Sequence, residues 1–283
     1  MELLFAVRPE KDTEEIVKTC NGQDVNDLTL FLDNHVNKAI PLILRSGCAD
    51  VASKWTHEYL KTAIQDGLEV DVDIAPPSSC GLFPDTKEER HALGIEEKLV
   101  PFASVLDGTC KPTPEHFAYV QQQSWPFDIV FPKLSNDLKM LSGPIIRKLS
   151  EFSAAKIFWF GISPTRSQLH FDRKNNFICQ MCGWKEILLF GPEETKFLYP
   201  RVSENSDDSF TNRFSRIDPN LSPECFHAKY PDVSKTIATR VILNPGDVLF
   251  VPTNWWHLVS SYTDPNRLTN IMVNMFFDKP NIK

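Results

Sequence analysis

The second half of the chain consists of short apolar segments separated by turn residues, and this pattern constrains the fold more than any other feature. From about Lys156 onward, segments of six to nine residues are rich in Ile, Val, Leu and Phe, namely AKIFWFGI, NFICQM, KEILLFG, TRVILN, DVLFVP, HLVSSY and TNIMVNMFF. Gly161, Gly183 and the sequence NPGD supply turn signals within or between them. Many short strands joined by tight turns are typical of a double-sheet jelly roll or a small barrel.

The first 150 residues mix helical and extended patterns. The sequence DVNDLTLFLDNHVNK predicts a helix that runs to about Lys38, and PLILR predicts a strand after it. Ser53 is the expected N-cap of a second helix, SKWTHEYLKTAI. Further predictions are strands at LEVDVDIA and HFAYVQQQ, short helical segments at FPKLSNDLKML and PEETKFLYP, and loops at PPSSCGLFPDTKEER and residues 201–231. We therefore expect a mainly β fold with α-helices, in which the helical N-terminal half packs outside the β half.

Composition and charge limit the classes of partner. The chain has 283 residues, a formal net charge of −7 and no block of five or more like charges, which disfavours a polyanion held on a basic face. No apolar stretch reaches the length of a membrane span, and the N-terminus lacks the basic start of a secretory leader, so no membrane association is expected. The seven cysteines are scattered, which favours a reducing compartment, the cytoplasm or the nucleus or both.

Cys179 and Cys182 form a C-x-x-C pair inside a strand-like segment. A redox or zinc site would need a helix start or a tight knuckle, and no second C-x-x-C lies nearby. The pattern favours two small apolar strand residues over either of those sites.

Two histidines and an aspartate form a candidate metal centre. His170 and Asp172 flank a phenylalanine, and side chains two apart on a strand point to the same face. His257 follows the strand-like VLFVP and two tryptophans. Two imidazoles and one carboxylate are typical of the facial triad of non-haem Fe(II), which leaves three coordination positions open. Taken singly, H-x-D is a common tripeptide, and His257 is compatible with a core histidine beside Trp255 and Trp256, themselves more typical of core or wall residues than of substrate contacts.

Lys185 supplies an independent argument, because it lies in the otherwise apolar segment GWKEILLF, thirteen residues after Asp172. A lysine buried among apolar groups is costly unless it meets an anion. The dicarboxylate 2-oxoglutarate would supply one: its keto-acid end chelates iron, and its far carboxylate needs a cation. The alternative is a lysine that reaches solvent from a strand edge.

These residues carry a family likeness. The run HFDRKNNFICQMCGWKEILLFGPEETKFLYP, with NPGDVLFVPTNWWH and NIMVNMFF, resembles the JmjC-domain Fe(II)/2-oxoglutarate oxygenases. It looks most like their small hydroxylase branch, which includes the asparaginyl hydroxylase of hypoxia-inducible factor and the tRNA wybutosine hydroxylase. The resemblance implies a double-stranded β-helix, a cupin-like barrel flanked by N-terminal helices. It also implies a single JmjC-type domain over residues 1–283, with a mixed lead-in over 1–117 and a jelly-roll catalytic core over 118–277.

The resemblance also implies a role for each matching residue. The catalytic iron would be bound by His170, Asp172 and His257, and the far carboxylate of 2-oxoglutarate by Lys185. Four further residues would bind or line the pocket of 2-oxoglutarate: Ser167, Tyr119, Asn176 and Asn274.

The implied activity is that of an Fe(II)- and 2-oxoglutarate-dependent dioxygenase. It would hydroxylate a C–H bond, first of all on a protein side chain, and release succinate and carbon dioxide. A modified tRNA base, demethylation of a lysine, and a non-catalytic binding scaffold remain alternatives. The complete set of ligands argues against a scaffold, the acidic balance against tRNA, and the lack of zinc-finger reader modules against a chromatin demethylase.

The expected partner is therefore a protein or peptide substrate. Its identity and the hydroxylated position do not follow from the sequence. The asparaginyl hydroxylase continues past the barrel into helices that form its dimer, whereas this sequence stops at Lys283. That mode of dimerisation is in doubt, and the oligomeric state stays open.

Overall fold

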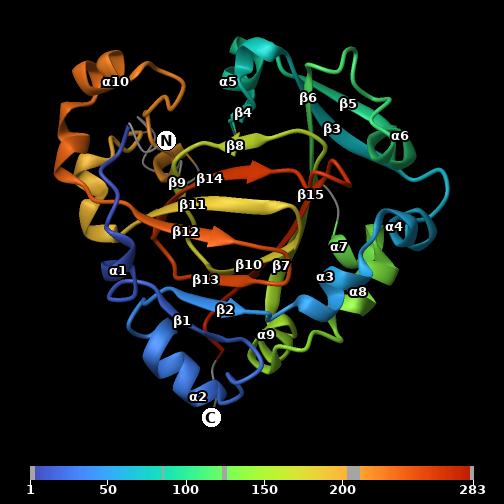
Figure 1. Cartoon of the computed structure of the whole chain (residues 1–283), viewed down its shortest axis with the longest axis horizontal. Helices are drawn as coiled ribbons and strands as arrows, with labels where there is room; N and C mark the ends of the chain where they lie inside the picture. The colour runs from blue at the N-terminus through green and yellow to red at the C-terminus, as the bar shows by residue number, and fades with distance from the viewer. Residues whose placement is uncertain (1–3, 85, 123–125, 203–210, 281–283) are drawn as a thin grey trace.

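The computed structural model describes residues 4–84, 86–122, 126–202 and 211–280, whose strands form two facing sheets (Figure 1). The nine strands of the larger sheet among these residues run in the order β1 (Lys18–Asn21), β2 (Leu42–Arg45), β13 (Val248–Val251), β10 (Asn175–Cys182), β15 (Asn270–Phe277), β7 (Ser153–Gly161), β6 (Phe117–Gln122), β3 (Glu69–Ala75) and β5 (Glu96–Pro101). The smaller sheet contains β12 (Thr239–Leu243), β11 (Trp184–Phe190), β14 (Trp256–Tyr262), β8 (Thr165–Ser167) and β4 (Leu82–Phe83), and β9 (His170–Phe171) pairs with β14.

The space between the two sheets is filled by apolar side chains from both. Ile178 and Leu249 of the larger sheet belong to one buried cluster with Ile187 and Leu189 of β11. Because side chains alternate along a strand, Lys185 lies on the same inward face of β11 as Ile187 and Leu189. The barrel interior therefore contains the lysine that the sequence places among apolar residues.

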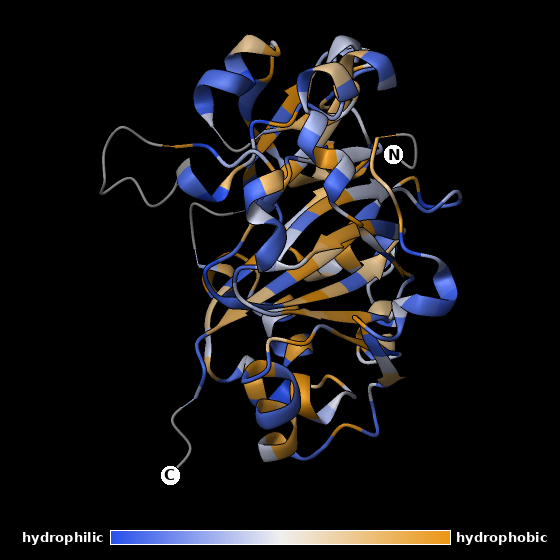
Figure 2. Ribbon diagram, turned by 90° about the vertical axis from the view of Figure 1, so that its left-hand side faces the viewer, coloured by the Kyte–Doolittle hydropathy of each residue, from blue (hydrophilic) through white to orange (hydrophobic). Residues whose placement is uncertain are grey.

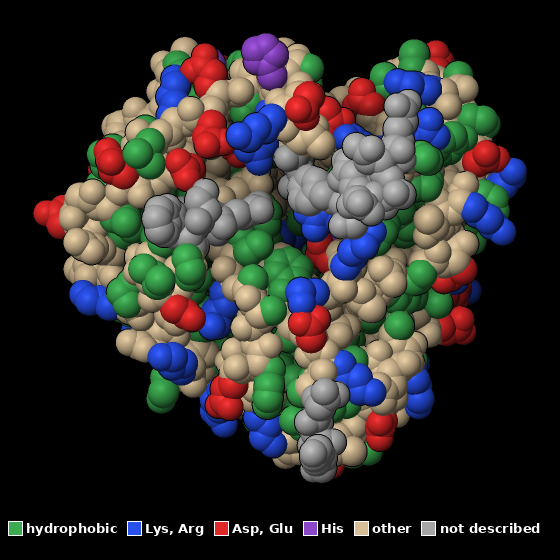
Figure 3. Space-filling model, turned by 180° about the vertical axis from the view of Figure 1, so that it is seen from behind, with side chains coloured by type: hydrophobic (Ala, Val, Ile, Leu, Met, Phe, Trp, Pro, Cys, Tyr) green, Lys and Arg blue, Asp and Glu red, His purple; other side chains and the backbone are tan. Residues whose placement is uncertain are grey.

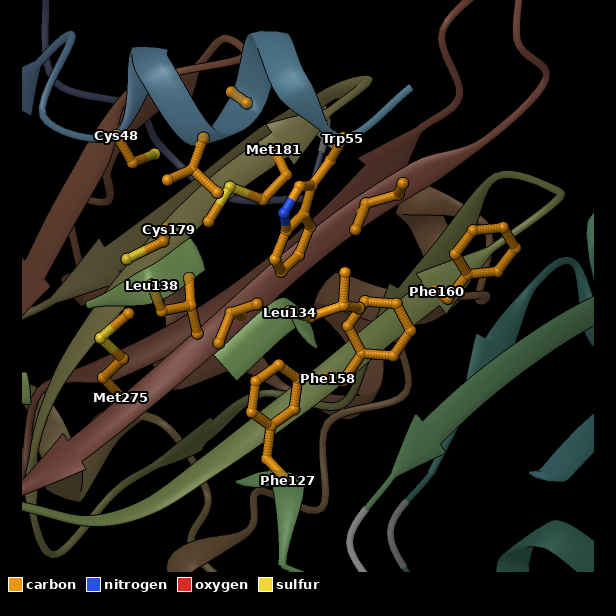
Figure 4. Close-up of a cluster of buried hydrophobic side chains, with 14 of the residues drawn as sticks. Cys48, Trp55, Phe127, Leu134, Leu138, Phe158, Phe160, Cys179, Met181 and Met275 are labelled. Carbon is orange, nitrogen blue, oxygen red and sulfur yellow. The ribbon is translucent and has the colours of Figure 1, made fainter. Parts of the chain in front are cut away.

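Helices cover the outer face of the larger sheet. Trp55 and Leu134 belong to the same buried cluster as Phe158 and Met181 of the sheet, as the close-up in Figure 4 shows. Figure 2 shows hydrophobic residues concentrated on the central strands and hydrophilic ones on the surrounding helices. The helices whose residues enter this cluster are α2 (Leu28–Phe31), η1 (Leu32–Val36), α3 (Ala49–Lys54), α4 (His57–Ala63), α6 (Phe102–Leu106), α7 (Phe127–Val130), α8 (Pro132–Leu138) and α9 (Pro144–Ser150).

A second layer covers the outer face of the smaller sheet. Trp256 and Leu258 of β14 pack in one cluster with Phe226 and Tyr230. The remaining helical segments are α1 (Glu10–Thr13), η2 (Pro77–Ser79), α5 (Lys87–Ala92), η3 (Pro192–Phe197), η4 (Thr211–Arg213), α10 (Pro223–Lys229) and η5 (Pro231–Lys235). With both outer faces covered, His257 on the inward face of β14 is held between packed layers.

Every strand predicted in the second half is present, but several local predictions are wrong. Ser53 lies inside α3, and Thr56 is the N-cap of α4, where its side chain accepts a hydrogen bond from the backbone N–H of Tyr59. The predicted loop over 201–231 contains η4 and α10, and residues 203–210 of it lie outside the described residues. The loop predicted at PPSSCGLFPDTKEER contains β4 and the start of α5.

The N-terminal half does more than cover the barrel. Its strand β2 lies between β1 and β13, and β3, β5 and β6 extend the same sheet beyond β7. The expectation that this half packs only outside the β half is therefore wrong for its strands, because hydrogen bonds between neighbouring strands join both halves. The division of the chain at residue 117 stays a prediction.

Two further observations bear on the sequence predictions. Within the described residues, no helix combines the length and the apolar character needed to cross a bilayer. All seven cysteines are free thiols, and Cys179 and Cys182 are buried in β10. They are strand residues, as their surroundings in the sequence predict.

Candidate metal centre

His170, Asp172 and His257 converge on one point. The strand β9 pairs antiparallel with β14 so that His170 lies opposite His257, and the centroids of their rings are 4.2 Å apart. One ligand atom from each of the three residues lies within 4.8 Å of the others, and His257 Nε2 is 3.6 Å from Asp172 Oδ2. Strand β9 ends at Phe171, so Asp172 lies just past the strand and still reaches the same point. Among the described residues, this is the group of His, Cys, Asp and Glu side chains suited to hold a metal ion.

Backbone carbonyls orient both imidazoles. His170 Nδ1 lies 2.8 Å from the carbonyl oxygen of Gln168, and His257 Nδ1 lies 3.0 Å from that of Trp255. A carbonyl oxygen only accepts, so each Nδ1 carries the hydrogen and donates it. Each Nε2 is then left with its lone pair for a metal, the arrangement usual for ligating histidines.

Burial keeps His257 neutral. It lowers the pKa of His257 from 6.5 to about 4, the neighbouring His170 lowers it further, and the carboxylate of Asp172 acts in the opposite direction. The imidazole is thus unprotonated at neutral pH, which is the form that binds a metal.

Arg213 and Phe214 support the other two ligands from a segment that the sequence suggested was a loop. A guanidinium nitrogen of Arg213 lies 3.8 Å from Asp172 Oδ1, and the guanidinium lies 5.0 Å from the centroid of the Phe214 ring. That ring stacks on His170 at a centroid distance of 5.9 Å. The backbone N–H of Asn254 donates to the carbonyl oxygen of Asp172 at 2.7 Å.

A second support was also missed in the sequence. The side-chain amide of Gln168 donates to both carboxylate oxygens of Glu89, at 3.1 and 3.2 Å. Arg201 pairs with the same carboxylate, and Thr86 donates to it at 2.8 Å. Since the carbonyl of Gln168 orients His170, Glu89 helps to hold that ligand. No sequence signal links residues so far apart.

A cavity of about 70 Å³ opens beside the two histidines. Of the residues that the sequence assigns to the 2-oxoglutarate pocket, Tyr119, Ser167 and Asn274 line it. Tyr119 stacks on Trp159 at a centroid distance of 5.6 Å, and Ser167 Oγ accepts from the backbone N–H of Val259 at 3.0 Å. The other lining residues are Phe83, Gln121, Trp159, Thr165, Arg166, His170, Ile178, His257, Val259, Ser261 and Met272.

Lys185 is fully buried next to this cavity. Its Nζ donates to Ser261 Oγ at 2.5 Å and to Asn270 Oδ1 at 2.8 Å, and both acceptors are neutral. Burial lowers the pKa of Lys185 from 10.5 to about 7. Ser261 itself lines the cavity, so the ammonium lies directly behind the wall. The alternative of a lysine that reaches solvent is wrong, because the side chain has no exposed surface.

Two asparagines carry polar atoms without protein partners. Both side-chain atoms of the fully buried Asn176, and Oδ1 of Asn274, make no hydrogen bond among the described residues. A buried polar atom left without a partner costs roughly 1–3 kcal/mol. Such atoms fit a polar ligand at this end of the barrel, and two neutral imidazoles with one carboxylate fit Fe(II). The residues present therefore suit both groups implied by the resemblance.

A wider cleft of about 320 Å³ adjoins the cavity and shares Trp159, His170 and Asn274 with it. Its remaining lining residues are Ala155, Ile157, Asp172, Arg173, Lys174, Arg213 and Phe276. Neither Trp255 nor Trp256 lines the cleft or the cavity among the described residues. Their indole nitrogens donate to the carbonyl oxygen of Ala39 and to Thr195 Oγ1, as structural residues would.

Comparison with known proteins identifies the family. A family model described as a cupin-like domain matches residues 28–283. The chain belongs to the cupin-like domain family. The jelly-roll fold and the JmjC resemblance predicted from the sequence are thereby confirmed, and the structure adds the His-Asp-His group.

Individual relatives agree with the family. Lysine-specific demethylase 8 of Xenopus tropicalis is 34% identical over 232 residues, which cover 81% of this chain and 47% of that protein. Jumonji C domain-containing protein 5 of Drosophila melanogaster is 41% identical over 104 residues, or 36% of this chain and 24% of that protein. The X-ray structure of E. coli ycfD matches with a TM-score of 0.50 at 16% identity, covering 90% of this chain and 53% of that chain, and supports the fold alone.

At the level of the family, this chain is related to 2-oxoglutarate-type oxygenases and demethylases, which generally use Fe(II) and 2-oxoglutarate. The chain spans less than half the length of the two curated relatives named above.

Proposed function

We propose that this chain is an Fe(II)- and 2-oxoglutarate-dependent dioxygenase that hydroxylates a C–H bond of a protein side chain. The observation that carries the proposal is the convergence of His170, Asp172 and His257 beside a cavity that has the buried ammonium of Lys185 behind its wall. An isolated metal triad would fit many reactions. A triad with a deep cation and neutral hydrogen-bonding groups fits a metal ion with a dicarboxylate.

The residues divide the work between them. The metal would be held by His170, Asp172 and His257, and Lys185 would meet the far carboxylate of 2-oxoglutarate through the wall position of Ser261. Fe(II) with 2-oxoglutarate and dioxygen supplies the oxidising chemistry, in which one oxygen atom enters the substrate C–H bond, the other enters succinate, and carbon dioxide leaves.

The other pocket residues would complete the binding of 2-oxoglutarate. Tyr119 and Ser167 line the same cavity, while Asn176 and Asn274 offer polar atoms that have no partner among the described residues. The apolar walls of Ile178 and Met272 exclude water, so hydrogen bonds and charges in the cavity act in a medium of low polarity.

A protein substrate is supported by the acidic balance of the chain, whose net charge is −7. Lysine demethylation is the second candidate, because the Xenopus relative is named a lysine-specific demethylase. A modified tRNA base is the third. The scattered free cysteines support a cytoplasmic or nuclear location.

The proposal is tested by adding Fe(II), 2-oxoglutarate and dioxygen to the purified chain and measuring succinate. His170→Ala should abolish iron binding and succinate formation, whereas His91→Ala, which removes an exposed histidine on α5, should change neither. Succinate formation that is the same in His170→Ala and the wild type would refute the iron assignment. Mass spectrometry of cellular proteins and RNA, with and without the active enzyme, should find a gain of one oxygen in protein.

A further inference from the structure

The cleft beside the metal ligands carries more positive than negative charge. Three cationic residues line it, Arg173, Lys174 and Arg213, and its one acidic lining residue among those described is Asp172. Since Asp172 is itself a candidate metal ligand, its charge is directed to the metal. A substrate that enters the cleft therefore meets a cationic rim.

The three cations differ in how far they are already engaged. Lys174 is paired with the exposed Asp278 at 2.5 Å, and Arg213 lies 3.8 Å from Asp172. Arg173 is exposed, and its guanidinium makes no hydrogen bond or ion pair with any residue that the structure describes. Arg173 is thus the cation best placed to meet an incoming anion.

The rest of the cleft suits a polypeptide. Ala155, Ile157 and Phe276 give it an apolar wall. Within the described residues, the buried indole Nε1 of Trp159 and Oδ1 of Asn274 have no hydrogen-bond partner, so the wall offers one donor and one acceptor. An apolar side chain with a neighbouring amide group satisfies all of these features.

We propose that the cleft selects an acidic polypeptide segment, with Asp or Glu close to the hydroxylated residue, rather than a methylated lysine. This inference rests on the proposed function and names the substrate class of the same site. A methylated ammonium group is normally recognised by an aromatic cage or a carboxylate, whereas here it would approach like charges.

A nucleic acid fits the charge of the cleft less well. A polyanion needs a continuous basic surface. The chain has a net charge of −7, and Figure 3 shows Lys and Arg side chains intermixed with Asp and Glu over one face of the molecule. A short acidic segment needs only the few cations of the cleft.

The test is direct binding of fluorescently labelled probes to the protein loaded with Mn(II) and 2-oxoglutarate. Four probes are compared at low salt: a nine-residue peptide with Glu on both sides of a central Asn, the same peptide with Lys in place of Glu, a trimethyl-lysine peptide and a ten-nucleotide single-stranded RNA. The acidic peptide should bind on the order of tenfold tighter than each of the other three. Arg173→Glu should remove that preference and Arg173→Lys should keep it. Lys98→Glu, a matched charge reversal at an exposed residue on β5, should also keep it.

Equal binding of the acidic and basic peptides, or tighter binding of the trimethyl-lysine peptide, would overturn the inference. Tighter binding of the RNA with the same dependence on Arg173 would replace the peptide by a nucleic acid and overturn it as well. The affinity of the wild-type protein for 2-oxoglutarate, measured by calorimetry, separates the two levels. If 2-oxoglutarate binds and the peptides are not distinguished, only the charge selection fails, whereas no binding of 2-oxoglutarate removes the proposed function.

Discussion

Replacement of Lys185 by methionine should make the protein more stable while it removes the affinity for 2-oxoglutarate. Burial lowers the pKa of Lys185 from 10.5 to about 7, which corresponds to about 5 kcal/mol against the charged form in the folded protein. Methionine fills a similar volume without a charge, but it leaves the acceptor atoms of Ser261 and Asn270 without their donor, at a cost of about 2 kcal/mol. The net gain expected for Lys185→Met at pH 6.5 is therefore about 3 kcal/mol.

The pH dependence of this gain follows from proton binding. Between pH 7 and 10.5, the unfolded chain keeps a proton on Lys185 that the folded chain has lost, so the stability of the wild type rises with pH. The methionine variant lacks this contribution. The difference in unfolding free energy between variant and wild type should shrink by about 3 kcal/mol from pH 6.5 to 9.5.

Urea denaturation of both proteins at the two pH values measures this difference, and Lys38→Met controls for the removal of an exposed lysine. A variant that is less stable than the wild type by the same amount at both pH values would refute the reasoning, because it would mean that the ammonium is not desolvated. Calorimetry in buffers of different ionisation enthalpy adds a second measurement. Above pH 7, binding of 2-oxoglutarate to the wild type should take up a proton and weaken as the pH rises, since the carboxylate favours the ammonium form.

Three further predictions concern the supports of the site. Glu89→Ala should weaken metal binding roughly tenfold by releasing Gln168, whose carbonyl orients His170, and a Co(II) titration with visible spectroscopy would contradict this if the affinity and spectrum were unchanged. Asn176→Leu should weaken 2-oxoglutarate binding without loss of thermal stability, since both polar atoms of Asn176 lack protein partners; unchanged affinity in calorimetry would exclude Asn176 from the pocket. Gly183→Ala should cost at least about 2 kcal/mol in urea unfolding, because Gly183 has a φ of +67° and an added Cβ would lie 2.7 Å from Asn270 Nδ2; a smaller loss would show that the turn before Lys185 adapts.

The chemistry of the site was predictable where it depends on residue type and short spacing. The pair His170 and Asp172, the distant His257 and the improbable position of Lys185 each carry a signal in the sequence, because a buried charge or a chelating pair has few structural reasons to occur. Strands in the second half were equally predictable, since apolar runs between turn residues leave little choice. The wrong N-cap at Ser53 shows the limit: Ser53 and Thr56 are both good caps, and only the packing of Trp55 ends one helix between them.

What the sequence could not provide are the groups that hold the ligands from far along the chain. Glu89 reaches His170 only through Gln168, and Arg213 reaches Asp172 from a segment that has no periodic pattern. These contacts exist because β9 lies between β14 and the segment around Phe214, an arrangement set by the pairing of strands rather than by local sequence. The same arrangement explains why a strained site can persist. The polar groups that lack protein partners lie at one end of the barrel interior, while Ile187 and Leu189 fill the space along the same strand as Lys185. The apolar layers on both outer faces then offset the cost of keeping such a site ready for its ligands.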